Sequence, residues 1–336
     1  MLNFIETLKR RDRFDSIIVG KKRSDNMSLI NELKPQETVQ GMYLCKFKQL
    51  LKNKNGKDYY TLKLQDRTGI VDGKIWCLHG GIGAFEVDDI IEVEGETLLY
   101  QDNMQLNVTK VQKAEGGYDL KDFLPHTKKD VNSLEASLMG FIDQVQNSYL
   151  KQLLEAILYE NKIFDAFTKH SGGKSVHHAY LNGLLEHTVT VTQIGIQLAS
   201  LYEGVCKDYV IAGCLLHDIG KLKELTPFPR NDYSDEGQLL GHLMIGAEMV
   251  HDAAKEIEGF PEEIERILKH ILIAHHGEYE YGSPKRPKCI EAMIVHLADY
   301  SDSRLKMMEE MIESSNEEPY AGYHKILTRN IRKVRL

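Results

Sequence analysis

Histidines crowd into one half of this 336-residue chain. Of its 14 histidines, eleven fall between His170 and His296, and only His79, His126 and His324 lie outside that stretch. Imidazole is the commonest metal ligand among side chains and the usual proton carrier near neutral pH. The crowding suggests that the chemistry of this protein resides in the second half of the chain.

An adjacent His217–Asp218 pair stands in the segment AGCLLHDIGK, where an apolar helical stretch runs into a glycine. A buried aspartate in that position is costly unless it is paired or binds a cation. Further histidines and one aspartate stand in or beside helical segments with an apolar face, so they can converge in the interior of one bundle. In chain order these are His187, His242, His275, His276 and Asp299. Ligation by histidine and carboxylate suits Mn, Fe, Co or Zn, and the absence of cysteine from this set of residues argues against a thiolate site.

Any one of these histidines alone is more often a packed or surface residue, but the ordered set H…HD…H…HH…D is far more specific. Between residues 133 and 309 the pattern resembles the HD-domain metal-dependent phosphohydrolases, which are named after the central His-Asp pair. By that resemblance, four residues match the quartet that holds one metal ion: His187, His217, Asp218 and Asp299. His242 and the His275–His276 pair match the subgroup that holds two ions, with Asp218 bridging. Which of the two adjacent histidines is a ligand stays open.

Two cations about 3.5–4 Å apart can lower the pKa of a bridging water and neutralise phosphate oxygens. The resulting hydroxide attacks phosphorus in line while the developing charge is stabilised. Lys221 follows His217 by four residues and lies on the same side if the helix continues, where it would contact phosphate. The alternative is a solvated lysine after the helix end. The residues expected to act in catalysis are His217, Asp218, Lys221 and His242.

The segments that carry these residues have the apolar spacing of helices from about residue 133 onward. Pro261 followed by two glutamates marks one helix start, because proline suits the first turn and acids suit the positive end of the dipole. The expected helices include LEASLMGFIDQVQ, YLKQLLEAILYENKIFDAF, LLEHTVTVTQIGIQLASLYE and PEEIERILKHILIAHH.

Residues from about Val39 to Lys113 are expected to form strands instead. The β-rich runs are VQGMYLCKFKQLL, YYTLKLQD, GIVDGKIW, DIIEVEGETLLY and MQLNVTKV. Five short strands with a longer break after the third match an OB-fold, a small Greek-key barrel that often binds single strands. We therefore predict a multidomain protein, with a small all-β OB-fold barrel over residues 28–115, a linker over 116–132 and an all-α HD-domain helical bundle over 133–318. A barrel with no ligand is the alternative.

Lysines gather in the first two expected strands and their loop, with aromatic side chains between them. Lysines that follow phosphates and aromatics that stack on bases are what a single-strand groove needs. The residues predicted to bind nucleic acid are Lys46, Lys48, Lys52, Lys54, Lys57, Tyr59 and Trp76 in the barrel, and His177 and His178 in the helical half. About half of the aromatics should instead face the barrel core, because alternate residues of a strand point opposite ways.

An OB-fold followed by an HD domain, with the stretches GKSVHHAYLNGLLEHTVTV and HHGEYEYGSPKRPKCIEAMIVHLADYSD, resembles the YhaM family of 3′-to-5′ exoribonucleases. The resemblance covers nearly the whole chain after Met27. It implies removal of nucleoside monophosphates from single-stranded RNA, with some activity on single-stranded DNA. It also implies two divalent metal ions, manganese first, with cobalt, iron or zinc as alternatives. Two other hypotheses remain: a phosphodiesterase or phosphohydrolase acting on a small nucleotide with a regulatory OB domain, and a nucleic-acid-binding module whose HD half is structural.

The composition, 42% hydrophobic and 27% charged, is that of a globular protein with about two domains. No apolar run approaches the ~20 residues of a membrane span, and the N-terminus turns charged where a signal peptide is apolar, so a cytoplasmic protein without a membrane partner is expected. Five scattered cysteines are expected to be reduced thiols. The net charge of -8 leaves room for a local basic groove only. A homo-oligomer is an open alternative to a monomer.

Both ends of the chain are basic. Residues 1–27 form an arm or extension, or Met27 is the true start. After Tyr320 the chain has five basic residues and no acid. For residues 319–336 we expect a basic C-terminal tail, either a solvated helix or a segment that contacts phosphate.

Overall fold

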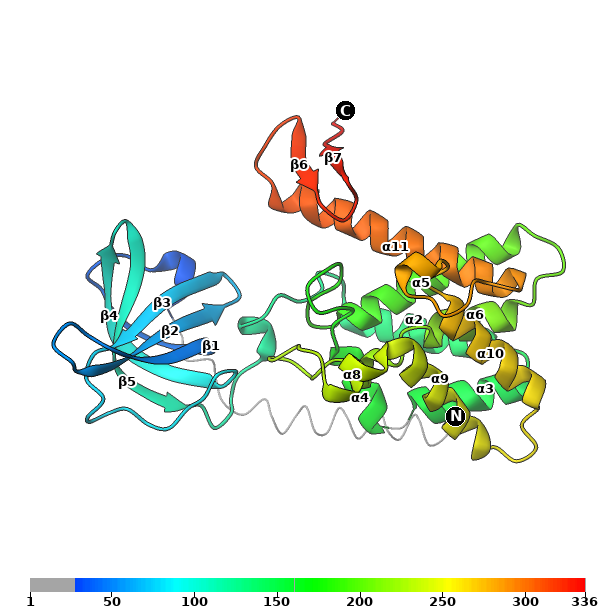
Figure 1. Cartoon of the computed structure of the whole chain (residues 1–336), viewed down its shortest axis with the longest axis horizontal. Coiled ribbons are helices and arrows are strands. Elements are labelled where there is room, and N and C mark those ends of the chain that lie inside the picture. The colour runs from blue at the N-terminus through cyan, green and yellow to red at the C-terminus, as the bar shows by residue number, and fades with distance from the viewer. Residues whose placement is uncertain (1–27, 160, 336) are drawn as a thin grey trace. The chain divides into compact units, whose positions relative to one another are not determined.

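The structure is a computed structural model that describes residues 28–159 and 161–335. The basic arm expected at residues 1–27 lies outside the described residues. The chain divides into two compact units after Pro125, and each is described by itself. The first appears in blue to cyan and the second in green to red in Figure 1. No helix in the described part of the chain is long and apolar enough to cross a membrane.

The first unit is a closed five-stranded barrel with the strand order β1-β2-β3-β5-β4. β3 and β5 pair in parallel and close the barrel, whereas the other neighbours are antiparallel. This topology is the predicted OB-fold. The strands are β1 (Thr38–Lys52), β2 (Asp58–Asp66), β3 (Gly69–Ile75), β4 (Ile90–Tyr100) and β5 (Asn103–Lys113), and two short 3-10 helices, η1 (Ile30–Glu32) and η2 (Leu120–Asp122), flank them.

Strand alternation decides which barrel residues are available to a ligand. Leu62 and Leu64 of β2 and Val71 and Ile75 of β3 are buried in the barrel core. Their neighbours in the two strands therefore point outward. Residues 76–89 connect β3 to β4 as a loop whose Phe85 is buried against the same core.

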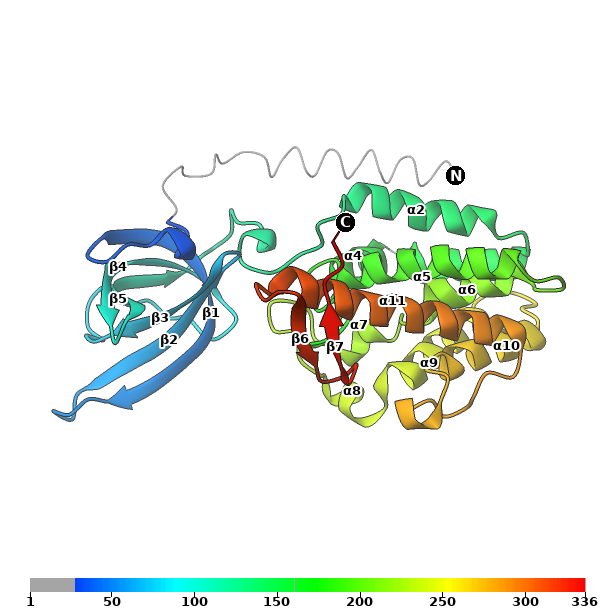
Figure 2. The same cartoon turned by 90° about the horizontal axis from the view of Figure 1, so that it is seen from above.

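The second unit is the predicted all-α bundle, with a small two-stranded sheet at its end (Figure 1). Its longest helix, α11, packs along α5 and α6, as Figure 2 shows from above. The helices are α2 (Val131–Gln144), α3 (Ser148–Leu158), α4 (Asn161–Lys169), α5 (Gly183–Ser200), α6 (Lys207–Leu216), α7 (Lys221–Glu224), α8 (Asp235–Leu239), α9 (Gly241–Lys255), α10 (Glu262–Ala274), η3 (Tyr279–Tyr281) and α11 (Ile290–Ser314).

The C-terminal segment differs from the helical tail that the sequence suggested. β6 (Tyr320–His324) and β7 (Arg329–Arg332) form an antiparallel hairpin. Leu327 and Ile331 of the hairpin pack with Met307 of α11. A helical tail is therefore wrong for this segment, because these apolar residues are buried by strand pairing and by contact with α11.

Candidate metal centre

Five helices of the bundle, α5, α6, α9, α10 and α11, bring polar side chains to one interior point, some from within the helix and some from its ends. His187 lies in the second turn of α5, and Asp299 lies in α11. His217 and Asp218 follow α6, His242 is the second residue of α9, and His275 and His276 follow α10. Asp218 is only 2% exposed, and His187, His217 and His275 are also buried. The structure thus brings together every residue that the sequence suggested as a metal ligand.

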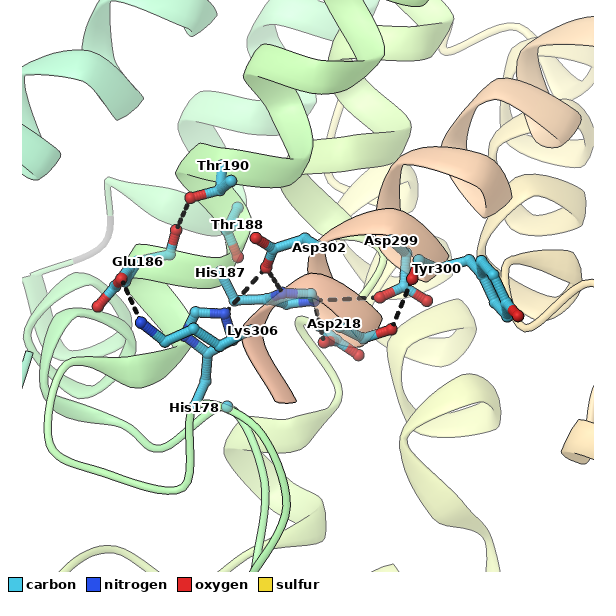
Figure 3. Close-up of polar contacts among 12 residues, drawn as sticks. His178, Glu186, His187, Thr188, Thr190, Asp218, Asp299, Tyr300, Asp302 and Lys306 are labelled. Carbon is cyan, nitrogen blue, oxygen red and sulfur yellow. Dashed lines mark hydrogen bonds and ion pairs between the residues drawn. The ribbon is translucent and has the colours of Figure 1, made fainter. Parts of the chain in front are cut away.

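His187 is the centre of the first group of close contacts. Its Nε2 atom lies 3.1 Å from His217 Nε2, 3.4 Å from Asp218 Oδ2 and 3.2 Å from Asp299 Oδ1. Figure 3 shows the His187 ring pointing toward both carboxylates. Two imidazoles, the Asp299 carboxylate and the Oδ2 atom of Asp218 therefore converge at one point.

His242 is the centre of the second group. Its Nε2 atom lies 3.2 Å from His276 Nε2 and 3.5 Å from Asp218 Oδ1. His275 Nε2 lies 3.8 Å from the same carboxylate oxygen. Asp218 therefore turns one oxygen, Oδ2, to the first group and the other, Oδ1, to the second.

The Nδ1 atom of each of these histidines is already engaged by an acceptor. These contacts are His187 to Asp302 Oδ2 (2.7 Å), His217 to the Cys214 carbonyl (2.8 Å), His242 to Glu224 Oε1 (2.9 Å), His275 to the Leu272 carbonyl (2.7 Å) and His276 to the Tyr281 carbonyl (2.9 Å). An acceptor at Nδ1 holds the proton there, so Nε2 of the neutral ring carries a lone pair. The lone pairs of the whole set face inward.

Facing lone pairs fit a cation and do not fit a hydrogen bond. Two nitrogen ligands about 2.0–2.1 Å from one ion, at tetrahedral or right angles, lie roughly 3 Å apart. The Nε2 pairs at 3.1 and 3.2 Å match that spacing. Asp218 Oδ1 and His275 Nε2 are buried and make no hydrogen bond with any described residue. The donor set therefore fits divalent metal ions.

The electrostatic field of the cluster also favours a cation. Burial would raise the pKa of Asp218, but the Lys221 ammonium and His217 hold it well below its usual value. Burial would lower the pKa of His187, yet the carboxylates of Asp218, Asp299 and Asp302 raise it well above its usual value. The carboxylates therefore stabilise positive charge at this point, either a second proton on His187 or a cation that replaces that proton and takes the Nε2 lone pair.

Lys221 reaches the centre by a route other than a continuous helix. α6 ends at Leu216, and Lys221 begins the short helix α7. Its Nζ atom lies 2.7 Å from Asp218 Oδ2 and donates to the Gly172 carbonyl at 2.6 Å. The helix does not continue from His217 to Lys221, and the partly buried ammonium contacts Asp218.

A cavity of about 350 Å³ opens beside the two groups. Asp218, His275, His276 and Asp299 are among the residues that line it. His177 also lines it, and burial lowers the pKa of that imidazole to about 3, so the ring is neutral. The volume suits a ligand the size of a nucleotide.

His178 does not fit the expected contact with nucleic acid. It is 1% exposed, its Nε2 atom lies 2.9 Å from Asp302 Oδ2, and its Nδ1 atom lies 2.9 Å from Tyr180 Oη. Figure 3 shows it to the left of His187, on the far side from Asp299. Both ring nitrogens of His178 are therefore occupied inside the bundle. The side chain holds Asp302 in place and is not available to contact a nucleic-acid strand.

Two carboxylates at the site were missed by the sequence analysis, Asp302 and Glu224. Each accepts from the Nδ1 of a histidine in the cluster, His187 and His242 respectively. Asp302 follows Asp299 by three residues in α11, a spacing that places both on one helix face and could have revealed it. No spacing of this kind in the sequence points to Glu224.

The barrel residues divide into two kinds. Tyr59 and Trp76 stack with ring centroids 4.6 Å apart, and Trp76 is 48% exposed. The Lys74 ammonium, which was not predicted, lies 5.7 Å from the Tyr59 ring centroid. Lys52, Lys54 and Lys57 are exposed in and beside the β1–β2 turn.

Lys46 and Lys48 are less free than expected. Lys48 donates to the Phe85 carbonyl and lies 3.4 Å from Glu86 Oε1, and Lys46 lies 3.9 Å from Asp88 Oδ1. These two lysines fasten the loop before β4 to β1. The exposed aromatic pair and the lysines of the turn are the better-placed candidates for a strand contact.

The fold and the cluster define an HD-domain enzyme, since residues 184–304 match the family model described as HD domain. The chain is 32% identical to the 3′-5′ exoribonuclease YhaM of Shouchella clausii (strain KSM-K16), over 82% of this chain and 87% of that protein. It is 31% identical to the 3′-5′ exoribonuclease YhaM of Listeria innocua serovar 6a, over 82% of this chain and 88% of that protein. The chain belongs to the YhaM family of 3′-5′ exoribonucleases and is a hydrolytic nuclease.

Two solved structures are similar to part of this chain. The second OB-fold domain of replication protein A from Methanococcus maripaludis is 20% identical, covering 27% of this chain and 98% of that chain, with a TM-score of 0.22. A replication protein A heterotrimer bound to single-stranded DNA is 10% identical, covering 30% of this chain and 72% of that chain, with a TM-score of 0.20.

Proposed function

We propose that this chain is a divalent-metal-dependent 3′-to-5′ exoribonuclease that hydrolyses single-stranded RNA, and also single-stranded DNA, to nucleoside monophosphates. The observation that carries the proposal is the inward set of Nε2 lone pairs around an Asp218 carboxylate that faces both groups. The names of the relatives support RNA as the substrate and the 3′ end as the starting point.

The ligand groups follow from the contacts. His187, His217 and Asp299 would hold one ion, His242, His275 and His276 would hold the other, and Asp218 would contribute to both. Bound divalent ions lower the pKa of a water molecule and neutralise the charge of a phosphodiester. Manganese is the expected ion, with cobalt, iron or zinc as alternatives, because a set of imidazoles and carboxylates without thiolate accepts all of them.

The chain's own residues prepare this site. Asp302 and Glu224 fix the tautomer and orientation of His187 and His242, as carboxylates behind metal-binding histidines do. Lys221 holds Asp218 as a carboxylate by charge and by contact. The cavity beside the cluster takes the 3′-terminal nucleotide and leaves its phosphodiester at the ligands.

The barrel supplies strand binding in this proposal. The stacked Tyr59–Trp76 pair offers an exposed aromatic face, and base stacking on such faces contributes about 1–3 kcal/mol per base. Lys52, Lys54 and Lys57 supply positive charge near the phosphates. Neither contact depends on base identity, which suits an enzyme that degrades many sequences.

The proposal is tested with a ~20-nucleotide single-stranded RNA, a length on the scale of OB-fold binding sites. The strand is labelled at its 5′ end, incubated with the chain and Mn²⁺, and followed on a denaturing gel. Shortening in one-nucleotide steps with release of nucleoside monophosphates is expected, and a chelator should stop it. Cleavage of small nucleotides alone would favour the phosphohydrolase alternative, and a mobility shift without cleavage would favour a binding module.

A further inference from the structure

We infer that a second cavity, walled by the C-terminal hairpin, binds the nucleotide that precedes the one being removed, and that Arg304 and Arg329 bind its 5′-phosphate. This inference rests on the proposed function, and it adds a binding site for the strand that remains after each cut. The site lies on α11 and the β6–β7 hairpin, both in the second unit.

The second cavity adjoins the one at the metal centre. It has a volume of about 300 Å³ and lies between α11 and the hairpin, where Met308, Leu327 and Arg329 line it. Tyr281, Tyr300, Arg304 and Ile326 line both cavities. A ligand that passes these shared residues therefore extends from the metal ligands to the hairpin.

Arg304 is the first reason to expect an anion here. Its side chain is half-buried, and its guanidinium carbon lies 5.0 Å from the Tyr300 ring centroid and 6.0 Å from the Tyr281 centroid. It forms no ion pair with any residue in the described ranges, 28–159 and 161–335. A half-buried arginine held between aromatic rings with its charge unmet is suited to a phosphate.

Arg329 is the second reason. Its Nε atom donates to the Leu327 carbonyl at 2.9 Å, which fixes the side chain at the mouth of the cavity and leaves its terminal N–H groups available. The described residues that line this cavity include no aspartate or glutamate. Two arginines without an acidic partner therefore border one nucleotide-sized space.

The position of the phosphates along a strand decides which nucleotide this is. When the last phosphodiester lies at the metal ligands, the terminal nucleoside has no other phosphate. The next phosphate belongs to the preceding nucleotide. Cationic side chains beyond the metal centre can therefore bind only the phosphate on the 5′ side of the scissile bond. Tyr281 and Tyr300 are 49% and 41% exposed, and their rings provide stacking surfaces for the base.

Two dinucleotides isolate this contact. UpU and pUpU share the scissile bond, at which water adds to phosphorus, the P–O3′ bond breaks and the freed 3′-oxygen takes a proton. They differ only in the 5′-phosphate of the preceding nucleotide. We expect kcat/KM to be about tenfold or more higher for pUpU, the usual gain from a hydrogen bond to a charged group. Arg329→Ala and Arg304→Gln should each reduce that ratio toward one.

Arg332→Ala is the matched control. Arg332 is an exposed arginine of the same strand, lies against the Tyr320 ring instead of the cavity, and should leave the ratio as in the wild type. Arg304→Lys keeps a charge at the half-buried position and should retain part of the ratio. A wild-type ratio near one, or a ratio that both arginine variants leave unchanged, would overturn this inference while the exonuclease stands. A wild-type chain that cleaves neither dinucleotide nor longer RNA would overturn the proposed function itself.

Discussion

Asp218 joins the two halves of the cluster, because each of its oxygens faces different histidines. Replacing it or His217 by alanine removes a ligand and leaves the remaining buried groups without their partner. We expect His217→Ala and Asp218→Ala each to abolish hydrolysis, and metal content measured on the purified variants to fall with it. Activity near that of the wild type, with metal content unchanged, would refute the site assignment.

Asp302 contacts the cluster indirectly, by accepting a hydrogen bond from the Nδ1 atom of His187. Asp302→Asn keeps the shape but removes the charge that His187 and His178 share. Changes behind a metal-binding histidine typically cost about 10–100-fold in metal affinity or activity. We expect a weakening of that size in a Mn²⁺ titration followed by electron paramagnetic resonance.

Glu309→Gln is the control for that titration, because Glu309 is an exposed carboxylate of the same helix whose partner is Lys306. It should bind Mn²⁺ as the wild type does. Equal affinities of Asp302→Asn and Glu309→Gln would show that Asp302 does not orient His187.

The residues that cluster at the candidate site could be predicted from sequence because they occur in a fixed order with apolar helical neighbours. The groups around it could not. Glu224 is one glutamate among many, and its contact with His242 exists only because α7 and α9 pack together. His178 stands in the same motif as His177, yet one is sealed inside the bundle and the other lines the cavity. The sequence alone does not indicate which of these two adjacent histidines faces the cavity.

At the scale of elements, the contact between α7 and α9 sets the distance from His242 to Asp218. Gly220, just before α7, lies so close to α9 that an added methyl group would collide with the His242 carbonyl and lie 2.7 Å from Gly246 N. We expect Gly220→Ala to lower the free energy of unfolding by about 1–3 kcal/mol, as overpacked cores do. Urea denaturation with a chelator present measures this, and a Mn²⁺ titration should also show weaker binding.

Gly140→Ala in α2 is the matched comparison. Apart from the chain neighbours and the backbone of the same helix, no atom of the described residues lies within 4 Å of an added methyl group there. Alanine in a helix interior should raise stability by about 0.5–1 kcal/mol relative to glycine. If Gly220→Ala and Gly140→Ala changed the free energy of unfolding equally, the close approach at Gly220 would not contribute to stability.

The helices and strands with strong periodicity were predictable, and the exceptions have physical causes. The five barrel strands follow from alternation and turn residues, and their paired order confirms the OB-fold. The expected single helix over residues 149–167 is instead α3 and α4. The hairpin was not predicted from sequence because its apolar residues are few and spaced among basic ones. Their burial depends on contact with α11.

For the whole molecule, capture and cutting are divided between two units in the proposed function. Lys52, Lys54 and Lys57 are exposed in the barrel, and none is a residue of the metal centre. Changing all three to glutamine should weaken binding of a ~20-nucleotide strand and reduce the salt slope by about 0.7 for each lost phosphate contact. Fluorescence anisotropy at several salt concentrations measures both, and cleavage of UpU should stay near the wild-type rate.

Lys110 and Lys113 provide the comparison, since their ammonium groups already pair with Glu94 and Asp89 at 2.7 and 2.6 Å. Changing these two to glutamine should leave the slope nearly unaltered. Unchanged slopes in the Lys52, Lys54 and Lys57 variant would leave the barrel without its assigned role, whereas the chemistry of the bundle would stand.

The central claim is that this cluster of imidazoles and carboxylates holds the metal ions that cut the strand. The most direct test is anomalous diffraction at the manganese edge from crystals of the whole chain grown with Mn²⁺. We expect two peaks, one among His187, His217 and Asp299 and one among His242, His275 and His276, with the Asp218 carboxylate touching both. Peaks located elsewhere, or none in crystals of a chain that degrades RNA with Mn²⁺, would contradict the claim.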